Sequence, residues 1–199
     1  MDLREEIELY TPFNAQEEAD RHVMLRALDC GSTCFERTAP AHMTCSIWTV
    51  DPTARQTLLV YHNIYNSWSW IGGHADGERD LAAVALRELR EETGVTGAHL
   101  IECGSGAIFS LEVLPVAGHE KRGRYVSSHT HLNVTYLAVA DPAEPLRICA
   151  DENSAVRWVP MEDAIALSNE PWIRERIYRK LIDKLRQHAD WVAWTQWTS

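Results

Sequence analysis

Residues Leu81–Glu92 read LAAVALRELREE, and this stretch determines how the rest of the chain is interpreted. At about 100° per residue it separates into an apolar sector and an adjacent acidic sector, each about 100° wide. The apolar residues are Ala82, Ala85, Leu86 and Leu89, and the acidic residues are Glu88, Glu91 and Glu92. The pattern predicts an amphipathic helix from about Asp80, which Gly94 ends because a left-handed residue commonly follows the last helical turn.

Three carboxylates on one side of a helix repel one another, and close to the helix C-terminus they also oppose the helix dipole. A divalent cation that prefers oxygen ligands would relieve this repulsion. The alternative is a solvated acidic face, partly neutralised by an ion pair between Arg87 and Glu91, which are four residues apart. The helix alone leaves both interpretations open.

The surrounding sequence adds a longer pattern: Gly73, thirteen residues, and then Arg87–Val95, which reads RELREETGV. It resembles the signature of the Nudix hydrolases: Gly, five residues, Glu, seven residues, Arg-Glu-apolar-x-Glu-Glu-x-Gly-apolar. Eight of the nine specified positions match, which is far more specific than a short glycine motif. Arg79 stands where the family has a Glu that supports the signature Arg, so we expect a modest loss of stability or activity.

The resemblance covers about 42–167 and implies the Nudix fold, an α/β structure with a mixed β-sheet sandwiched between helices (α/β/α). The expected organisation is an N-terminal helical extension at 1–41, a Nudix hydrolase domain at 42–168, and a C-terminal helix with a Trp-rich tail at 169–199. In this family, water attacks a phosphorus of a nucleoside diphosphate linked to another group, and Mg²⁺ or Mn²⁺ is the cofactor. The resemblance therefore implies a pyrophosphohydrolase.

The resemblance also assigns roles to the signature residues. Glu91 and Glu92 correspond to direct metal ligands, and Glu88 corresponds to a ligand or to the base for the attacking water. The backbone carbonyl of Gly73 corresponds to a further ligand, where a glycine lets the metal approach the main chain. Arg87 corresponds to a residue that orients these carboxylates without binding the metal itself.

One candidate ligand lies outside the signature. Glu152 precedes Trp158 by six residues, a spacing similar to that of a late Glu that joins the metal site in MutT-type members of the family. The alternative is a surface turn before a strand, and the short match leaves both open.

Aromatic side chains are the first candidates for substrate contacts. Tyr65, Trp68 and Trp70 precede the expected metal loop and could stack on a base or another flat group. Their alternative role, which suits at least two of the three, is packing around a hairpin.

Basic residues and histidines are the second set of candidates. Lys121, Arg122 and Arg124 could hold a terminal phosphate, or they could form a solvated basic run. His129 and His131 alternate on an expected strand and so face one side of it. They either line a cleft or form a hydrogen-bonded pair in its wall.

The remaining elements follow from capping residues and alternation. Asn14 and Glu17 suit the start of a helix as N-cap and capping-box partner. The expected helices are 14–28, 161–167 and 171–187; the expected strands are 42–50 and 57–62, which form a hairpin, together with 107–113, 131–139 and 155–159; and a basic loop is expected at 119–124.

Composition limits the function classes. A formal net charge of −10 argues against a general nucleic-acid binder, which needs a basic face for phosphates. No apolar run reaches the ~20 residues that span a bilayer, and the acidic start of the chain is not a secretory signal. We expect no membrane partner, a cytoplasmic location, and a small phosphorylated substrate such as a nucleotide derivative. The five cysteines are scattered and indicate free thiols.

Two rival functions remain. The stretch Ser67–His74 is similar to the approach to the active site of isopentenyl-diphosphate isomerase, but Gly72 stands where that enzyme has its catalytic cysteine. A catalytically weak Nudix-fold protein that binds a ligand or regulates is the second rival, although all three signature glutamates are present. Trp191, Trp194 and Trp197 indicate packing of the tail against the domain or against a second subunit in a homodimer.

Overall fold

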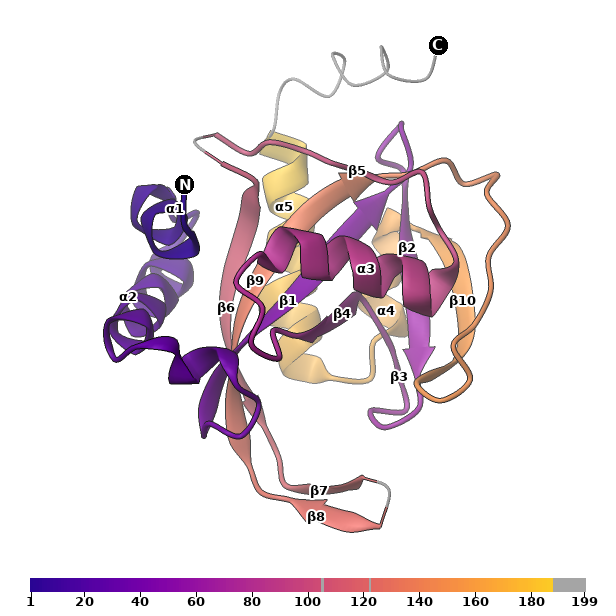
Figure 1. Ribbon diagram of the computed structural model, residues 1–199. Coiled ribbons are helices and arrows are strands. Elements are labelled where there is room, and N and C mark those ends of the chain that lie inside the picture. Colours follow the sequence, from indigo (N-terminus) through magenta and orange to yellow (C-terminus); the bar gives the residue numbers. More distant parts are fainter. Residues whose placement is uncertain (105, 122, 188–199) are drawn as a thin grey trace. The chain divides into compact units, whose positions relative to one another are not determined.

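The computed structural model (Figure 1) describes residues 1–104, 106–121 and 123–187. These residues form two compact units, each assembled from separate stretches of the chain. The first unit contains Met1–Ser46, Gly72–Ala85 and Glu102–Tyr136. The second unit contains Ile47–Ile71, Leu86–Ile101 and, of the described residues, 137–187.

Four elements run from one unit into the other and are shared between them. These elements are β1 (Ala41–Val50), β4 (Ile71–His74), α3 (Leu81–Thr93) and β9 (His129–Val139). The first unit also has α1 (Leu3–Leu9), α2 (Ala15–Asp29), the 3-10 helix η1 (Ser32–Phe35), β6 (Ile108–Val116), β7 (His119–Lys121) and β8 (Arg124–Val126). The second unit also has β2 (Gln56–His62), β3 (Ser67–Ser69), β5 (His99–Leu100), β10 (Asn153–Pro160), α4 (Met161–Leu167), the π-helix η2 (Ile173–Tyr178) and α5 (Arg179–Gln187).

The strands pair in both directions. In the second unit their order is β10-β2-β1-β9-β5, with β3 on β2, and the β1–β2 hairpin is antiparallel as expected. In the first unit β6 pairs antiparallel with β9, and β4 pairs with β1. Thr130 donates its N–H to Pro40 at one end of β1 and β9, and Ala140 donates to Val50 at the other, so these two strands are parallel. A mixed sheet with flanking helices confirms the predicted fold class.

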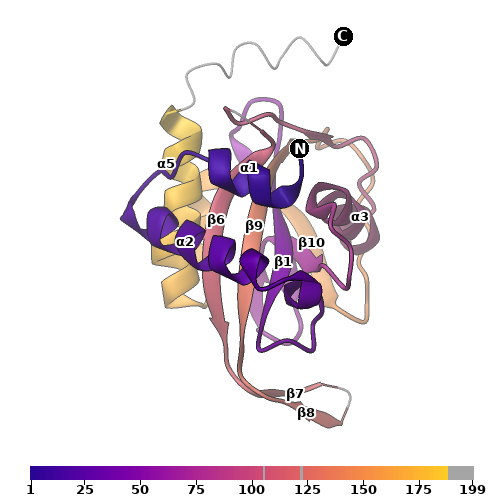
Figure 2. The same ribbon diagram turned by 60° about the vertical axis from the view of Figure 1, so that its left-hand side comes forward.

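Helix α2 begins at the N-cap that the sequence predicts. Asn14 caps it by accepting the N–H of Glu17 at 3.0 Å. The Glu17 side chain is fully buried and accepts from the backbone N–H of Phe13 at 2.7 Å, one residue before the N-cap whose N–H a capping box would use. In Figure 2, α2 crosses in front of β6, and the two elements are in contact. The N-terminal helices are therefore part of the core of the first unit.

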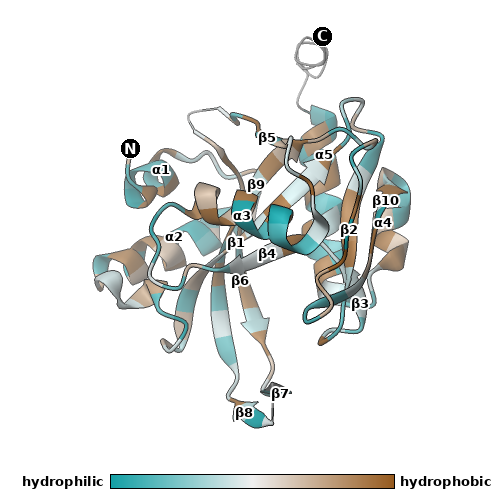
Figure 3. Cartoon of the chain, turned by 45° about the vertical axis from the view of Figure 1, so that its right-hand side comes forward, coloured by the Kyte–Doolittle hydropathy of each residue, from teal (hydrophilic) through white to brown (hydrophobic). Residues whose placement is uncertain are grey.

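Helix α3 also matches its prediction, with a different buried face. Asp80 starts it by accepting the N–H of Ala83 at 2.9 Å, and Gly94 follows it with φ of +82°. The α3 ribbon in Figure 3 carries both hydrophobic and hydrophilic residues. The buried apolar residues are Leu81, Val84, Ala85 and Leu89, whereas Ala82 and Leu86, which were expected in the apolar sector, are only half-buried.

One local prediction was wrong. The expected basic loop is a β-hairpin, in which Lys121 of β7 pairs with Arg124 of β8. The helix expected at 171–187 is present and includes the π-helical stretch η2, and α1 is an additional helix that was not predicted. The tail tryptophans Trp191, Trp194 and Trp197 lie outside the described residues. The domain boundaries at 41/42 and 168/169 stay predictions.

Within the described stretches of the chain, no helix has both the length and the apolar character needed to cross a membrane.

Candidate functional site

Three glutamates meet in the second unit. Glu88 and Glu92 are four residues apart on α3, and Glu152 lies just before β10; each has a carboxylate oxygen within 4.8 Å of the others. Glu92 is 3% exposed, Glu88 is half-buried, and Glu152 is exposed. The structure thus brings the predicted ligand from outside the signature to two of the signature glutamates. We refer to these three residues as the acidic cluster.

A buried asparagine fixes the Glu152 loop to the end of α3. Asn153 has no exposed surface and donates its side-chain amide to the backbone carbonyl of Glu92 at 3.1 Å. Its side-chain oxygen accepts the N–H of Cys149 at 3.2 Å. Two backbone hydrogen bonds also hold the loop. The N–H of Glu152 donates to the Cys149 carbonyl at 2.9 Å, and the N–H of Asn63 donates to the Glu152 carbonyl at 3.0 Å. These bonds hold the residue next to Glu152 in a defined position against α3.

The acidic cluster has the donor set of a hard divalent cation. Three carboxylates within 4.8 Å of one another repel strongly in a partly buried setting. Mg²⁺ and Mn²⁺ prefer oxygen ligands and keep waters or substrate oxygens in their other positions. The residues present therefore fit the metal that the resemblance implies.

The other signature residues are not members of the acidic cluster. Glu91 is exposed and is not a member of the acidic cluster. Arg87 is half-buried on α3 in the second unit, and Gly73 is half-buried on β4 in the first unit. Arg79 is exposed, and its guanidinium lies 5.1 Å from the centre of the Phe35 ring, within range of a cation–π contact. The Arg79 side chain therefore has a local partner in the first unit.

The aromatic candidates are engaged in packing. The Trp68 ring lies edge-on to Tyr61, with 5.6 Å between centroids, and the Arg157 guanidinium lies 4.4 Å from its centre. Trp70 contacts Tyr178 edge-on at 5.7 Å, and its backbone N–H donates to the Tyr178 hydroxyl at 2.9 Å.

Tyr65 is the aromatic candidate most accessible to a ligand. Its side chain is 42% exposed, and its ring lies 4.4 Å from that of His62. The basic candidates Lys121 and Arg124 pair across the β7–β8 hairpin, where Arg124 is exposed. Arg122 lies outside the described residues. The predicted substrate roles of all these residues stay predictions.

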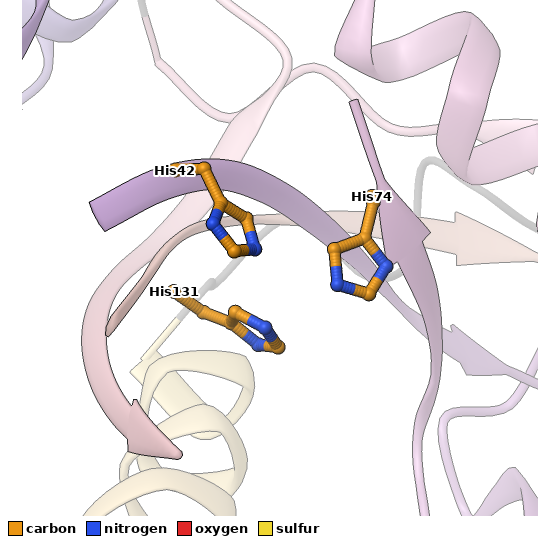
Figure 4. A group of neighbouring side chains, drawn as sticks. All are labelled: His42, His74 and His131. Carbon is orange, nitrogen blue, oxygen red and sulfur yellow. The ribbon is translucent and has the colours of Figure 1, made fainter. Parts of the chain in front are cut away.

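The two histidine candidates belong to a larger group in the first unit. His129 Nε2 and His131 Nε2 are 3.1 Å apart, so these residues form the hydrogen-bonded pair that was one of the two sequence interpretations. Beside them lie His42 and His74, and each of the rings of His42, His74 and His131 has a nitrogen within 4.8 Å of the others (Figure 4). Neither His42 nor His74 was singled out in the sequence, because they stand alone on strands that are far apart along the chain.

The surroundings of two of these histidines, His131 and His42, favour the neutral imidazole. Burial, together with the neighbouring imidazoles of His74, His42 and His129, lowers the pKa of His131 to about 3. Burial also lowers the pKa of His42, although its hydrogen bond to the Ala39 carbonyl opposes the shift. Neutral imidazoles keep a nitrogen lone pair available.

Strand β4 approaches β1 too closely for a side chain at Gly72. A Cβ built there would lie 2.4 Å from the carbonyl oxygen of Cys45 and 2.8 Å from Ser46 Oγ. The first of these atoms is backbone and cannot move aside cheaply. Only glycine fits this position of the strand as it stands.

The chain was compared with known proteins. Its fold is similar to a hydrolase of the NUDIX family from Clostridium perfringens, with a TM-score of 0.54 and 18% identity over 73% of this chain and 96% of that chain. It is also similar to a dihydroneopterin triphosphate pyrophosphohydrolase from E. coli (TM-score 0.53, 16% identity, 73% and 97% covered). A C. elegans Ap4A hydrolase in a binary complex gives a TM-score of 0.50 at 20% identity, with 72% and 94% covered.

At these identities the likeness concerns the fold. No curated protein matches the chain. The family comparison is more informative, because the NUDIX domain matches residues 40–181, which contain both the signature and the acidic cluster. On that match, which takes in most of its residues, the chain belongs to the NUDIX domain family.

Proposed function

We propose that this protein is a divalent-metal-dependent hydrolase that cleaves a pyrophosphate bond in a nucleoside diphosphate linked to another group. The observation that carries the proposal is the acidic cluster, in which Glu152 joins Glu88 and Glu92 within 4.8 Å. Glu152 comes from a separate part of the second unit, so the cluster is more than the acidic face of one helix.

The enzyme class rests on the family. Its members and the similar structures support a hydrolase that acts on anhydride bonds. The similar structures include an Ap4A hydrolase and a dihydroneopterin triphosphate pyrophosphohydrolase. Both names describe small phosphorylated substrates that contain phosphoanhydride bonds, and we carry this substrate class over to the present chain.

The acidic cluster would hold Mg²⁺ or Mn²⁺ through its three carboxylates. When bound, such an ion neutralises negative charge on phosphate oxygens and polarises the phosphorus for attack by water. Glu92, which is almost fully buried, is best suited to anchoring the ion. Glu88 is half-buried and reaches solvent, so it is our choice for the group that accepts the proton of the attacking water.

The surrounding residues set the geometry of these carboxylates. Asn153 ties the Glu152 loop to the Glu92 carbonyl and so fixes the distance between the two elements that supply ligands. Arg87, on the same helix as Glu88, is proposed to orient the carboxylates, as the resemblance implies. The proposed location is cytoplasmic, and a homodimer is proposed without nucleic-acid or membrane partners.

The isomerase rival is disfavoured by the geometry at Gly72. A cysteine there would place its Cβ 2.4 Å from the Cys45 carbonyl oxygen, which is not a sustainable contact. The regulatory rival is disfavoured by the intact acidic cluster, which a protein without catalysis has no need to keep together.

A metal-dependent activity assay tests the proposal. We expect product release from dinucleoside polyphosphates, nucleotide sugars, ADP-ribose, dinucleotide cofactors or oxidised nucleotides, with Mg²⁺ required and the cleaved bond mapped by phosphorus NMR. Glu92→Gln should fold normally and lose at least about a hundredfold in kcat, equivalent to about 2.7 kcal/mol. Glu102→Gln, a change at an exposed glutamate outside the acidic cluster, should match the wild type.

The outcomes separate the hydrolase from its rivals. Activity that persists without metal would contradict the metal dependence, and no activity across the whole panel would favour the regulatory rival. Equal activity of Glu92→Gln and Glu102→Gln would remove the acidic cluster from the mechanism.

A further inference from the structure

We propose that His42, His74 and His131 form a second metal site, separate from the acidic cluster, which binds a transition-metal ion such as Zn²⁺. Each residue offers one ring nitrogen, and these nitrogens all lie within 4.8 Å of one another. We refer to these three residues as the histidine triad. The proposal does not depend on the proposed hydrolase activity, because the triad and the acidic cluster have no residue in common.

Three neighbouring strands assemble the triad. Strand β1 supplies His42, and its neighbours β4 and β9 supply His74 and His131. The N–H of Ala75 bonds to the Met43 carbonyl at 3.1 Å, which sets His74 beside His42. The N–H of Thr130 bonds to the Pro40 carbonyl at 2.9 Å, which sets the start of β9 beside the start of β1. The backbone therefore determines the grouping of the three rings (Figure 4).

His42 has the features of a pre-oriented ligand. Its side chain is 2% exposed, and its Nδ1 lies 2.8 Å from the carbonyl oxygen of Ala39. A carbonyl can only accept, so Nδ1 carries the proton and Nε2 carries the lone pair. His42 Nε2 is buried and has no hydrogen-bond partner within the described structure. A buried, unpaired acceptor is costly, and a metal ion would satisfy it.

The ring of His131 is oriented in the same way by a fourth histidine. His129 Nδ1 lies 2.8 Å from the Ser127 carbonyl, so its Nε2 is an acceptor in the neutral ring. That Nε2 lies 3.1 Å from His131 Nε2, which must therefore donate, and this leaves His131 Nδ1 with the lone pair. A ligating histidine typically donates its other N–H to a hydrogen-bond acceptor, and here the acceptor is the imidazole of His129. His129 is therefore a positioning residue for the triad.

The choice of metal follows from the donors. Neutral imidazoles suit Zn²⁺, Ni²⁺, Co²⁺ and Cu²⁺, whereas Mg²⁺ prefers oxygen. Three protein nitrogens with a fourth position open to water is a common arrangement for Zn²⁺. Zn–N bonds of about 2.0–2.1 Å in a tetrahedron require nitrogens about 3.3 Å apart. Side-chain rotation of the half-buried His74 and His131 can close the remaining gap from within 4.8 Å.

The carboxylate of Asp76, near the triad in sequence, is paired with Arg37. Both oxygens of Asp76 accept from the Arg37 guanidinium, in contacts that link Nε to Oδ1 and Nη2 to Oδ2. Arg37 holds the pKa of Asp76 below its ordinary value. The donor set of the triad is therefore nitrogen, and this separates it chemically from the acidic cluster.

Zinc binding to the purified, chelator-treated protein tests the proposal. We expect equilibrium dialysis with Zn²⁺ in a large excess of Mg²⁺ to leave one Zn²⁺ per chain. His74→Ala and His131→Ala should each weaken this binding at least about tenfold, and His129→Ala should weaken it about 10–100-fold. His22→Ala, a matched change at an exposed histidine on α2, should bind as the wild type does.

A second measurement needs no variant. Addition of Zn²⁺ should shift the imidazole NMR signals of His42, His74 and His131 and leave those of His22 in place. The proposal would be overturned if His22→Ala lost the bound Zn²⁺, or if all variants bound Zn²⁺ equally. It would also be overturned if the NMR signals of the triad did not shift at saturating Zn²⁺. Glu92→Gln should keep the Zn²⁺ site, so failure of the hydrolase proposal and failure of this one are distinguishable.

Discussion

The carboxylate of Asp51 stabilises the β1–β2 turn of the second unit. It is 7% exposed and accepts from the backbone N–H groups of Arg55 at 2.8 Å and Gln56 at 2.7 Å, and from Thr53. Burial raises the pKa of Asp51, but the hydrogen bonds from Thr53, Gln56 and Arg55 outweigh burial and leave the pKa below its ordinary value. The ionised form is therefore the one that the fold prefers.

Asp51→Asn should lower the free energy of unfolding by about 1–2 kcal/mol at neutral pH. Because the folded-state pKa is depressed, the contribution of Asp51 is fully present above the unfolded pKa of about 3.9 and is lost as pH falls through the lower folded value. Urea unfolding at pH 7 and at pH 3 measures the difference. A gap between variant and wild type that is as large at pH 3 as at pH 7 would contradict this account.

At the scale of elements, the loop before β10 depends on Asn153 for its position against α3. The side-chain amide of Asn153 donates to the Glu92 carbonyl and accepts the N–H of Cys149, and the residue is fully buried. Because Glu152 is its neighbour, a loosened loop would move one carboxylate away from the other two.

Asn153→Ala should therefore weaken Mg²⁺ activation about 10–100-fold, as changes behind metal ligands do. It should also cost about 1–3 kcal/mol of stability, because buried polar groups lose their partners. A Mg²⁺ titration of activity, beside thermal unfolding, separates the two effects. The control is Ser154→Ala at the exposed next residue of β10, which should change neither quantity.

Local signals in the sequence were enough to predict the helices and strands that carry the site. Asn14, Asp80 and Gly94 mark helix ends through hydrogen bonds and backbone angles that are decided within a few residues. The β7–β8 hairpin was missed because β7 is wholly polar and each strand has only three residues, which is too short for alternation to mark a strand. The helical signals at 171–187 predict a helix and do not distinguish its π-helical stretch η2 from an α-helix.

The groupings of side chains were predicted less completely. Glu88 and Glu92 share a helix, so their proximity follows from the helical repeat, and Glu152 was found through its spacing from Trp158. The histidine triad depends on the parallel pairing of β1 with β9 and on β4 beside β1. Such long-range pairing leaves no mark in the sequence near His42 or His74.

At the scale of the whole molecule, the N-terminal helices complete the first unit. Glu17 of α2 accepts from the Tyr10 hydroxyl at 2.6 Å and from the Ser110 hydroxyl of β6 at 2.7 Å. Ser110 also contacts Glu112, which accepts from Asn133 at 3.0 Å. Glu17, Ser110 and Glu112 have no exposed surface. This network joins residues 1–41 to the strands behind them.

Deletion of residues 1–29 should therefore prevent stable folding. It would expose β6 to water and remove Glu17 and Tyr10 from the buried network around Ser110. Differential scanning calorimetry should show a lost or strongly lowered transition. A truncated chain that melts like the full-length protein would show that the helices are a dispensable extension.

The contact at Gly72 limits how this protein could change its chemistry. Ser46 Oγ, one of the atoms in the way, donates to Asn133 at 3.0 Å, and Asn133 is bonded to Glu112 and Thr135. Acquiring a thiol nucleophile at position 72 would therefore require coordinated changes in β1 and in the polar interior of the first unit. A single nucleotide substitution in the codon for Gly72 would not open that evolutionary route.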